Sequence, residues 1–210
     1  MAARTSAIYL CVMTSVFLLI RTPLAAAWGP EGHAIIALIA EKNMSAGALR
    51  QSNILLRGAS LQDVASWPDE VVHLLPATAS WHYIDIPLQD SAINLREECR
   101  NGNCVMVKTE QFLSVLTDPD AGRAQKALAL KFVVHFIGDL HQPLHCENND
   151  DEGGNTREVI FEGHPDRLHW VWDTGLLREI DQNPEQLAAT LERQITPQDR
   201  RAWEKGSIGD

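Results

Sequence analysis

The sequence predicts a mostly α-helical fold with little strand content, and three observations support this prediction. Apolar residues recur at helical spacing throughout Gly122–Leu140. Prolines stand where helices are expected to begin, at Pro30, Pro184 and Pro197. Alternation of the kind that strands show is confined to short stretches. The pattern therefore favours a helical domain in which strands have a minor role.

The expected helices follow one another with short connections. They begin at Pro30, run from Ser45 to near Gly58, cover Thr109–Leu116, Gly122–Leu140 and Arg167–Ile180, and open again at Asn183 and Thr196. A short helical turn is expected before the break at Trp67-Pro68-Asp69. Trp81–Pro87 and Arg157–Phe161 are expected to be short strands or extended segments. Residues 88–106 are expected to be irregular, and no internal repeat or long linker divides the chain.

The first 27 residues have the features of a secretory signal peptide. Arg4 precedes the apolar run Ile8–Ile20, and Ala25–Ala27 supplies small residues for cleavage. The run is too short for a comfortable membrane span, so we expect removal rather than anchoring. Cleavage after Ala27 would make Trp28 the first residue of a single domain, residues 28–210. The expected location is secreted or periplasmic.

The chain is acidic, with a formal net charge of −10 from 18 basic and 28 acidic residues. The predicted signal contains two of the basic residues and none of the acidic ones, so its removal would leave a charge of −12. Such a chain lacks the basic surface that sequence-independent wrapping of duplex nucleic acid requires. Bound cations could neutralise several of these carboxylates.

Three of the four cysteines lie in the predicted mature chain. Cys99 and Cys104 flank the tight turn Arg-Asn-Gly-Asn, which can close as a small disulfide loop in an oxidising compartment. Cys146 is then unpaired beside His145. It could be a thiolate ligand of a metal, but a partly buried free thiol is the favoured interpretation.

Two His/Asp pairs have the spacing of metal ligands on a helix. His135 and Asp139 are four residues apart, as are His169 and Asp173, so each pair points in one direction. His145 follows the first pair, beyond the helix break at Pro143. Together these residues indicate a site for more than one metal ion, although each pair alone could be a local contact on a helix surface.

Three further residues could complete such a site. Asp69 follows a stiff Trp-Pro break, His82 lies between two aromatic residues, and His33 lies five residues after the expected new N-terminus. Each also has a simpler interpretation. An aspartate after a turn is usually a helix cap, and a single histidine between aromatic residues is usually a core residue whose ring nitrogens are hydrogen-bonded.

Taken together, the motifs resemble the S1/P1 nuclease family, the trinuclear zinc nucleases that are related in fold to bacterial zinc phospholipase C. The resemblance runs from Trp28 to about Asp173 and more loosely to the end of the chain. The matching motifs, in family order, are Trp28-Gly-Pro-Glu-Gly-His33, Ser66-Trp-Pro-Asp69, His82-Tyr-Ile-Asp85, His135-Phe-Ile-Gly-Asp139, Gln142-Pro-Leu-His145, Gly153-Gly-Asn155 and His169-Trp-Val-Trp-Asp173.

The resemblance implies a centre of three zinc ions. The first would be held by Asp69, His82, His135 and Asp139, the second by Asp139, His33 and the amino nitrogen and carbonyl oxygen of Trp28, and the third by His145, His169 and Asp173. Asp69 would also orient the attacking hydroxide. Nitrogen and carboxylate ligands suit zinc, which makes hydroxide available near neutral pH. A retained signal peptide would acylate the Trp28 nitrogen, so processing is expected to precede activity.

The resemblance also implies a substrate. We expect hydrolysis of phosphodiester bonds in single-stranded DNA and RNA with 5′-phosphate products, together with 3′-nucleotidase activity. Tyr83 would stack on a base, Asp85 would bond to the base edge, and Asn155 would also contact the substrate. Core packing is the alternative role for Tyr83. Stacking requires unpaired bases and tolerates any sequence. A monomer is expected, with no stable protein partner and no membrane anchor.

Two departures from the family pattern leave alternatives open. Many members carry arginine three residues after the zinc-binding aspartate, where this chain has Val72, so lower activity or an altered substrate preference is expected. Members also continue beyond the position of Asp210, which implies that C-terminal helices are lacking here. A zinc phospholipase C is one alternative, although its last carboxylate ligand is usually glutamate rather than aspartate. An inactive, truncated metal-binding homologue is the other.

Overall fold

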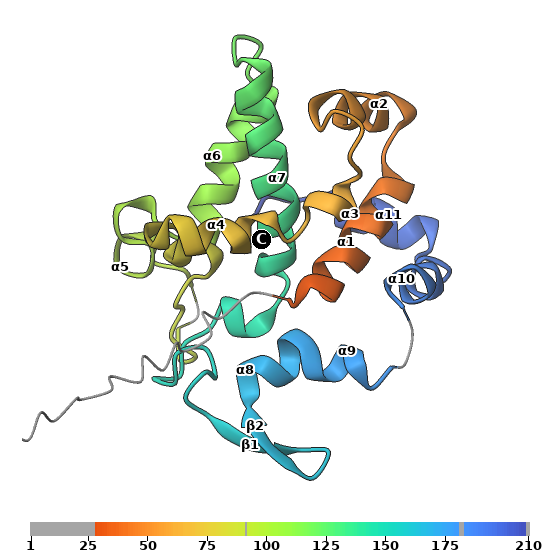
Figure 1. Ribbon diagram of the computed structural model, residues 1–210. Helices are drawn as coiled ribbons and strands as arrows, with labels where there is room; N and C mark the ends of the chain where they lie inside the picture. The colour runs from red at the N-terminus through yellow and green to blue at the C-terminus, as the bar shows by residue number, and fades with distance from the viewer. Residues whose placement is uncertain (1–27, 91, 181–182, 209–210) are drawn as a thin grey trace, which may run out of the picture.

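The computed structural model describes residues 28–90, 92–180 and 183–208, and these residues are mostly helical (Figure 1). The expected fold class is confirmed, while the predicted signal peptide lies outside the described residues. The helices are α1 (Pro30–Asn43), α2 (Ala46–Leu55), α3 (Leu61–Val64), α4 (Trp67–Leu74), α5 (Leu95–Glu98), α6 (Val105–Thr117), α7 (Arg123–Leu140), α8 (Leu168–Trp170), α9 (Leu176–Arg178), α10 (Pro184–Glu192) and α11 (Pro197–Trp203).

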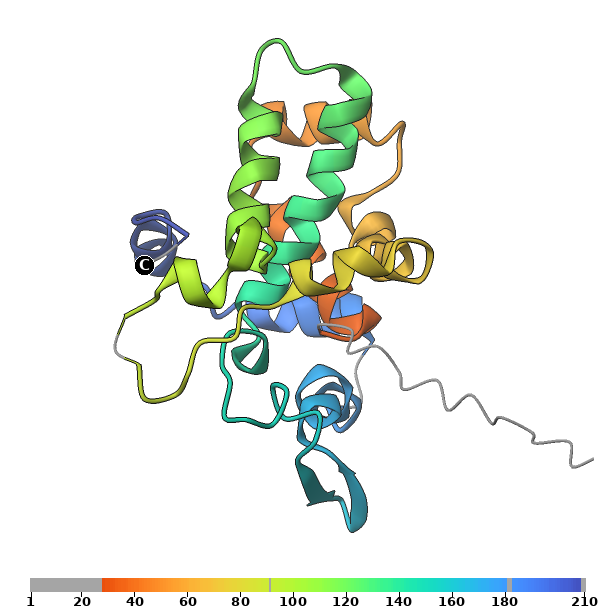
Figure 2. The same ribbon diagram turned by 90° about the vertical axis from the view of Figure 1, so that its left-hand side faces the viewer.

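Helix α7 is the central element of the molecule. It lies beside α6 along much of its length, and α1, α2 and α4 also pack against it (Figures 1 and 2). The ring of Phe132 on α7 stacks on Phe112 of α6 with centroids 4.4 Å apart. Phe136, one turn further along α7, is fully buried in the same cluster as Val105. Apolar burial therefore fixes the C-terminal half of α7, which carries the predicted metal ligands.

Two smaller apolar clusters hold the N-terminal helix in place. Ala37 of α1 packs with Leu61 and Val64 of α3, and Ile35 of α1 packs with Leu187 of α10. The packing of α1 is thus shared between helices that are distant in sequence. Since α1 also contacts α7, its buried face lies against the central helix at the level of His33.

The starts of α1, α2, α10 and α11 agree with the residues that predicted them, whereas α6 begins at Val105 rather than Thr109, and α5 lies in the stretch 88–106 that was expected to be irregular. Proline occupies the first or second position of α1, α4, α10 and α11, where its missing N–H costs nothing. The side chains of Ser45, Asn183 and Thr196 accept hydrogen bonds from backbone N–H groups in the first turns of α2, α10 and α11. The break at Trp67-Pro68 is also confirmed, but it opens a helix, α4, that the sequence did not predict.

The extended segment around His82 differs from the prediction. Trp81 and His82 end a 3₁₀ helix, Pro76–His82, and the extended backbone begins only at Tyr83. The N–H of Ile84 donates to the carbonyl of His145 at 2.8 Å. The local conformation depends on this long-range hydrogen bond and on the 3₁₀ helix that begins at Pro76. The alternation of residue types in the sequence indicated neither feature.

The expected strand at Arg157–Phe161 is present as β1 (Glu158–Phe161), but its partner was not predicted. It pairs with β2 (His164–Arg167) in an antiparallel hairpin, the only sheet in the described part of the chain. Both turn residues, Glu162 and Gly163, have positive φ, the conformation that a tight two-residue hairpin turn requires.

The helical segment after β2 is continuous but not regular. A π-helical turn, Val171–Gly175, joins α8 to α9, so the predicted helix at Arg167–Ile180 is confirmed with a local widening at Asp173. Single π-turns inside helices occur frequently at functional sites. Near the end of the described chain, the side chain of Trp203 on α11 is 68% exposed.

Candidate metal centre

The site is built around α7, where His135 and Asp139 point the same way and are fully buried. The Nε2 atom of His135 lies 3.3 Å from an oxygen of Asp139 and 3.3 Å from an oxygen of Asp69 on α4. His82 approaches from the 3₁₀ helix, with Nδ1 3.2 Å from Asp139. We call these four residues, together with His33, the deep group.

His33 completes the deep group from α1. Its Nε2 atom lies 3.4 Å from Oδ1 of Asp139, and its ring stacks on that of His135 with centroids 3.9 Å apart. Gly138 permits this approach, because a Cβ there would lie 3.0 Å from Nδ1 of His33. Both ring nitrogens of His33 and both carboxylate oxygens of Asp139 are buried without a hydrogen-bond partner in the described part of the chain. Buried polar atoms of this kind are costly unless something binds them.

A second cluster, the pocket group, consists of His145, His169 and Asp173. His145 lies on the 3₁₀ turn after α7, His169 lies on α8, and Asp173 lies on the π-turn. The Nε2 atoms of the two histidines face each other at 3.1 Å, and Nε2 of His169 lies 3.1 Å from an oxygen of Asp173. All three side chains are buried.

Backbone carbonyls orient the histidine rings. Nδ1 of His135 lies 2.7 Å from the carbonyl of Ala65, that of His145 lies 2.8 Å from the carbonyl of His82, and that of His169 lies 2.6 Å from the carbonyl of Gly153. Because a carbonyl only accepts, each Nδ1 must carry the proton, and in a neutral ring Nε2 is then a lone pair. Histidines that bind metals are oriented in this way.

Burial and neighbouring charged groups shift the pKa values of histidines in the deep group in opposite directions. Burial, reinforced by neighbouring histidines, holds the pKa of His33 well below its usual range. Burial would also lower the pKa of His135, but the carboxylates of Asp139 and Asp69 outweigh it and raise this pKa to about 9. The carboxylates of Asp139 and Asp69 therefore favour positive charge beside His135, which a divalent cation between these side chains would supply in place of a proton.

The pocket group has a different electrostatic balance. Burial lowers the pKa of His145, so its ring is neutral near pH 7. Burial also raises the pKa of Asp173, although the neighbouring histidines His169 and His145 and the amide of Gln142 oppose the shift. Three groupings of nitrogen and oxygen ligands could hold metal ions: His33/His135/Asp139, Asp69/His82/His135 and His145/His169/Asp173. Eight of the nine expected ligands thus come together through their side chains.

The ninth expected ligand, Trp28, was predicted to act through its main-chain atoms. The next residue, Gly29, donates its N–H to the carbonyl of Asp173 at 2.8 Å, which ties this end of the described chain to the π-turn. A Cβ at Gly29 would come within 3.1 Å of that same carbonyl, so this junction is closely packed. The role of Trp28 as a ligand remains a prediction.

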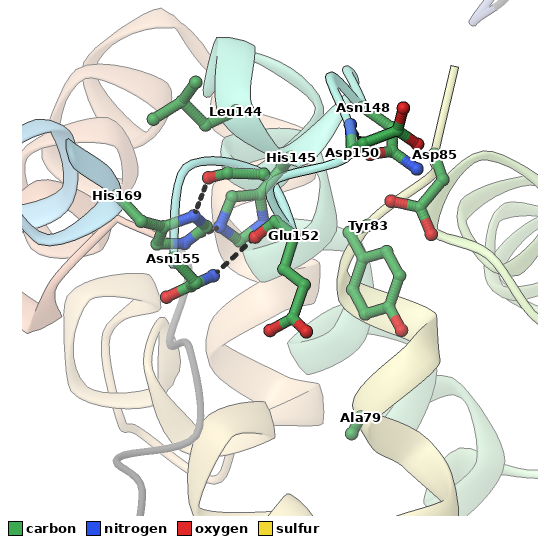
Figure 3. Close-up of a pocket in the computed structure, with 11 residues that line it drawn as sticks. Ala79, Tyr83, Asp85, Leu144, His145, Asn148, Asp150, Glu152, Asn155 and His169 are labelled. Carbon is green, nitrogen blue, oxygen red and sulfur yellow. Dashed lines mark hydrogen bonds between the residues drawn. The ribbon is translucent and has the colours of Figure 1, made fainter. Parts of the chain in front are cut away.

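The predicted substrate residues gather beside the pocket group. Tyr83, Asp85 and Asn155 line a cavity of about 520 Å³ together with His145 and His169 (Figure 3). Tyr83 is 41% exposed, which argues against the core-packing alternative for its ring. The amide of Asn155 donates to the carbonyl of Glu152 at 2.9 Å, so this side chain also closes its own loop. Carboxylates at Asp85, Asp150 and Glu152 make the cavity acidic, and none of the described residues that line it is lysine or arginine.

The cysteines behave as the sequence suggested. Cys99 and Cys104 form a disulfide, and Cys146 is free. Burial raises the pKa of the Cys146 thiol to about 11, which favours a protonated thiol over the alternative of a thiolate ligand. Val72 is buried on α4, so an arginine installed at this position would have to displace apolar packing before it could reach a phosphate.

Two structural features of the site were not predicted from the sequence. Gln142 is fully buried and donates to Asp173 at 2.6 Å. Asp151 accepts from the N–H of Gly154 at 2.9 Å and holds the loop that presents the Gly153 carbonyl to His169. Gly153 has φ +60°, and a Cβ there would clash with the carbonyl of Leu144. The signal for Gln142 was its place in the Gln-Pro-Leu-His motif.

Comparison with known proteins identifies relatives of this arrangement. A family model described as S1/P1 Nuclease matches residues 28–209. Endonuclease 1 of Arabidopsis thaliana is 30% identical over 214 residues, which cover 93% of this chain and 70% of that protein. Nuclease P1 of Penicillium citrinum is 32% identical over 163 residues, 73% of this chain and 59% of that protein. Nuclease S1 of Aspergillus oryzae is 32% identical over 160 residues, 72% of this chain and 55% of that protein.

The matched regions are thus between 55% and 70% of the length of these three relatives. In the part of the chain that the structure describes, no helix is long and apolar enough to cross a lipid bilayer.

Proposed function

Because this chain belongs to the S1/P1 nuclease family, a family of phosphodiester hydrolases, we propose that it is a zinc-dependent nuclease acting on single-stranded DNA and RNA. The products would carry 5′-phosphates, and 3′-nucleotides would be dephosphorylated. The observation that supports metal dependence most directly is the His145–His169 pair. Both Nδ1 atoms donate to carbonyls, so in the neutral rings two lone pairs face each other at 3.1 Å beside a carboxylate. A cation is the natural occupant of such a position.

The donor set fits zinc, which prefers histidine nitrogens and carboxylate oxygens. In the proposal, Asp69, His82, His135 and Asp139 hold one ion, Asp139, His33 and the main-chain nitrogen and oxygen of Trp28 hold the second, and His145, His169 and Asp173 hold the third. Bound zinc lowers the pKa of water and neutralises charge on phosphate. The two oxygens of Asp139 face different histidines, Oδ1 toward His33 and Oδ2 toward His82 and His135, as a bridging carboxylate requires.

Asp69 is the proposed catalytic residue. Its side chain is 19% exposed, whereas His33, His135 and Asp139 are fully buried. It is therefore the carboxylate of the deep group that solvent reaches. Its accessible oxygen can accept a hydrogen bond from the attacking water and orient that water for in-line displacement at phosphorus.

The cavity in Figure 3 is the proposed base site. The half-exposed ring of Tyr83 offers a stacking surface, Asp85 can accept from the amino groups of a base edge, and Asn155 lies beside His169. Because the described residues that line the cavity include carboxylates and no lysine or arginine, bound cations would attract the phosphate in this proposal. Stacking on Tyr83 requires an unpaired base, which accounts for the preference for single strands.

Processing is part of the proposal. Residues 1–27 would direct secretion, and their removal would free the amino nitrogen of Trp28 to bind the second ion. The mature chain would then act outside the cytoplasm as a monomer, without a membrane anchor or a stable protein partner. Activity would therefore be coupled to export.

The proposal is tested by loading the processed chain with zinc and measuring bound zinc and nucleotide release together. A single-stranded oligonucleotide, its duplex and phosphatidylcholine vesicles serve as parallel substrates. We expect three ions per chain, cleavage of the single strand well ahead of the duplex, and 5′-phosphate ends by mass spectrometry. Release of nucleotides from neither nucleic acid by the fully loaded chain would overturn the proposal, and hydrolysis of the lipid alone would identify a phospholipase C.

A further inference from the structure

We propose that Gln142 is a positioning residue for the pocket group, one that selects which oxygen of Asp173 faces the metal and holds His145 in place beside it. The inference rests on the proposed zinc centre. Gln142 itself would not touch the ion or the substrate. Its fully buried side chain lies between the turn that carries His145 and the π-turn that carries Asp173.

The orientation of the Gln142 amide is set by a backbone donor. The N–H of Leu144 lies 2.7 Å from Oε1 of Gln142, and an N–H can only donate, so this atom must be the amide oxygen. The other end of the amide is then the NH₂ group. It lies 2.6 Å from Oδ1 of Asp173, where it donates to the carboxylate. A swapped amide would place two donors face to face at Leu144.

This hydrogen bond divides the two oxygens of Asp173 between different tasks. Oδ1 accepts from Gln142, while Oδ2 lies 3.1 Å from Nε2 of His169 and faces the position proposed for the ion. Hydrogen bonds to an ionised group in a buried setting are stronger than neutral ones. Gln142 therefore favours the charged carboxylate and leaves one oxygen available for a metal.

Asp139 provides the contrast within the same molecule. Both of its oxygens are buried, and neither has a hydrogen-bond partner among the residues that the structure describes. It can offer one oxygen to each of two ions, whereas Asp173 can offer one oxygen to a single ion. The hydrogen-bond pattern thus separates a bridging carboxylate from a terminal one.

Gln142 also reaches a second member of the pocket group. Its carbonyl accepts the N–H of His145 at 2.9 Å, and its side chain accepts the N–H of Leu144 in the same 3₁₀ turn. One residue thus connects the two elements that must meet for the pocket group to form. Loss of the amide would leave the Leu144 N–H without this acceptor and would release the carboxylate of Asp173 to rotate.

The test compares Gln142→Met and Gln142→Glu, which conserve volume and remove the donor, with Gln62→Met. Gln62 is the matched control, since its amide also donates to a carboxylate, that of Glu185 at 3.0 Å, but near the surface and away from the centre. Stepwise zinc affinities are measured by chelator competition, and cobalt-loaded samples report ligand geometry through their visible spectra. Neither readout depends on catalysis.

We expect both Gln142 variants to bind two ions as tightly as the parent and the third about 10- to 100-fold more weakly, the usual effect of losing a residue that orients a metal ligand. Excess zinc should restore the third ion, and the cobalt spectrum should lose the contribution of one site. Gln62→Met should match the parent.

The inference would be overturned if both Gln142 variants bound three zinc ions as tightly as the parent. It would also be overturned if the affinities for all three ions fell equally, which would indicate a general packing role for Gln142. If Gln142→Met does not fold, Gln142→Glu carries the test with its volume and polarity retained. The parent chain separates this inference from the proposed function. If the parent chain binds three ions and cleaves single strands, and the Gln142 variants do the same, only the role of Gln142 is disproved. If the parent chain does not bind a third ion, the proposed three-zinc centre is disproved.

Discussion

The deep group and the pocket group contain similar side chains but are held in different ways. In the deep group, the side chains come from helices α1, α4 and α7 and from the 3₁₀ helix that ends at His82. The ring of His135 donates to the carbonyl of Ala65, but His33 and Asp139 have no hydrogen-bond partner among the described residues. In the pocket group, the ligands lie on a turn, a short helix and a π-turn, and each is fixed by a hydrogen bond to a carbonyl or to Gln142. Helix packing can thus hold buried polar side chains without a hydrogen bond to each one, whereas the proposed ligands on irregular backbone are each fixed by a hydrogen bond.

The largest expected effect comes from the residue that would serve two ions. Asp139→Asn should lower cleavage of single-stranded DNA by about a thousandfold or more, because several kcal/mol of charge stabilisation are lost. Bound zinc should fall by more than one ion, whereas Asp173→Asn should lose one. Zinc content and initial rates check both, with Glu110→Gln on the exposed face of α6 as a control. Equal zinc losses in the two variants would remove the distinction between the groups.

Removal of zinc should destabilise the protein mainly through the deep group. An ion present at about 1,000 times its dissociation constant stabilises the folded state by about 4 kcal/mol. Without ions the buried atoms of Asp139 and His33 keep only their contacts with each other and with His82 and His135, and none of these is a hydrogen bond, whereas the pocket group keeps its hydrogen bonds. Thermal unfolding with and without chelator should therefore show a smaller difference in His33→Gln than in His169→Gln. The reverse order would contradict this view of the two groups.

An added residue before Trp28 tests the edge of the deep group. One glycine joined to the amino group of Trp28 would turn a proposed ligand into an amide. The affinity for the second zinc ion should fall by more than about tenfold, because the loss of even a residue that only orients a ligand lowers metal affinity by at least about that factor. The matched control carries the same glycine at the C-terminus. Unchanged zinc affinities in the N-terminally extended chain would show that Trp28 is not a ligand.

The smallest expected effect lies at the cavity beside the pocket group. Tyr83→Ala should raise KM for a single-stranded oligonucleotide about 5- to 150-fold, since stacking on one base is worth about 1–3 kcal/mol. Tyr83→Phe keeps the ring and should behave like the parent, and zinc content should not change in either. A parallel loss in Tyr83→Phe would place the contribution in the hydroxyl group rather than in stacking.

The sequence predicted most where structure depends on local rules. Periodicity located α7, the i, i+4 spacing placed His135 beside Asp139, and the turn residues between Cys99 and Cys104 indicated the disulfide. The family resemblance named the other ligands, and the structure brings their side chains together. The roles of these residues as ligands remain predictions until ions are measured.

The features that were missed depend on contacts between distant segments. The 3₁₀ end at His82 depends on pairing between Ile84 and His145, some sixty residues apart, and the role of Gln142 depends on a carboxylate on another element. The partner strand β2 has the sequence His-Pro-Asp-Arg, which carries no strand propensity and forms only because β1 lies beside it. Such pairings leave no local periodicity to detect.

His82 and Tyr83 are adjacent in the chain and point in opposite directions, so the distance between the deep group and the cavity is fixed. His82 turns inward to the deep group while Tyr83 turns outward to the cavity, and hydrogen bonds at both His82 and Ile84 join this segment to His145. The proposed stacking surface of Tyr83 and the proposed metal ligands His82 and His145 are therefore held at a fixed separation. With a base stacked on Tyr83, the nucleic acid would present its phosphate to the metal centre at a constant distance from that base. Each cleaved phosphodiester bond would then lie the same number of bonds from the stacked base.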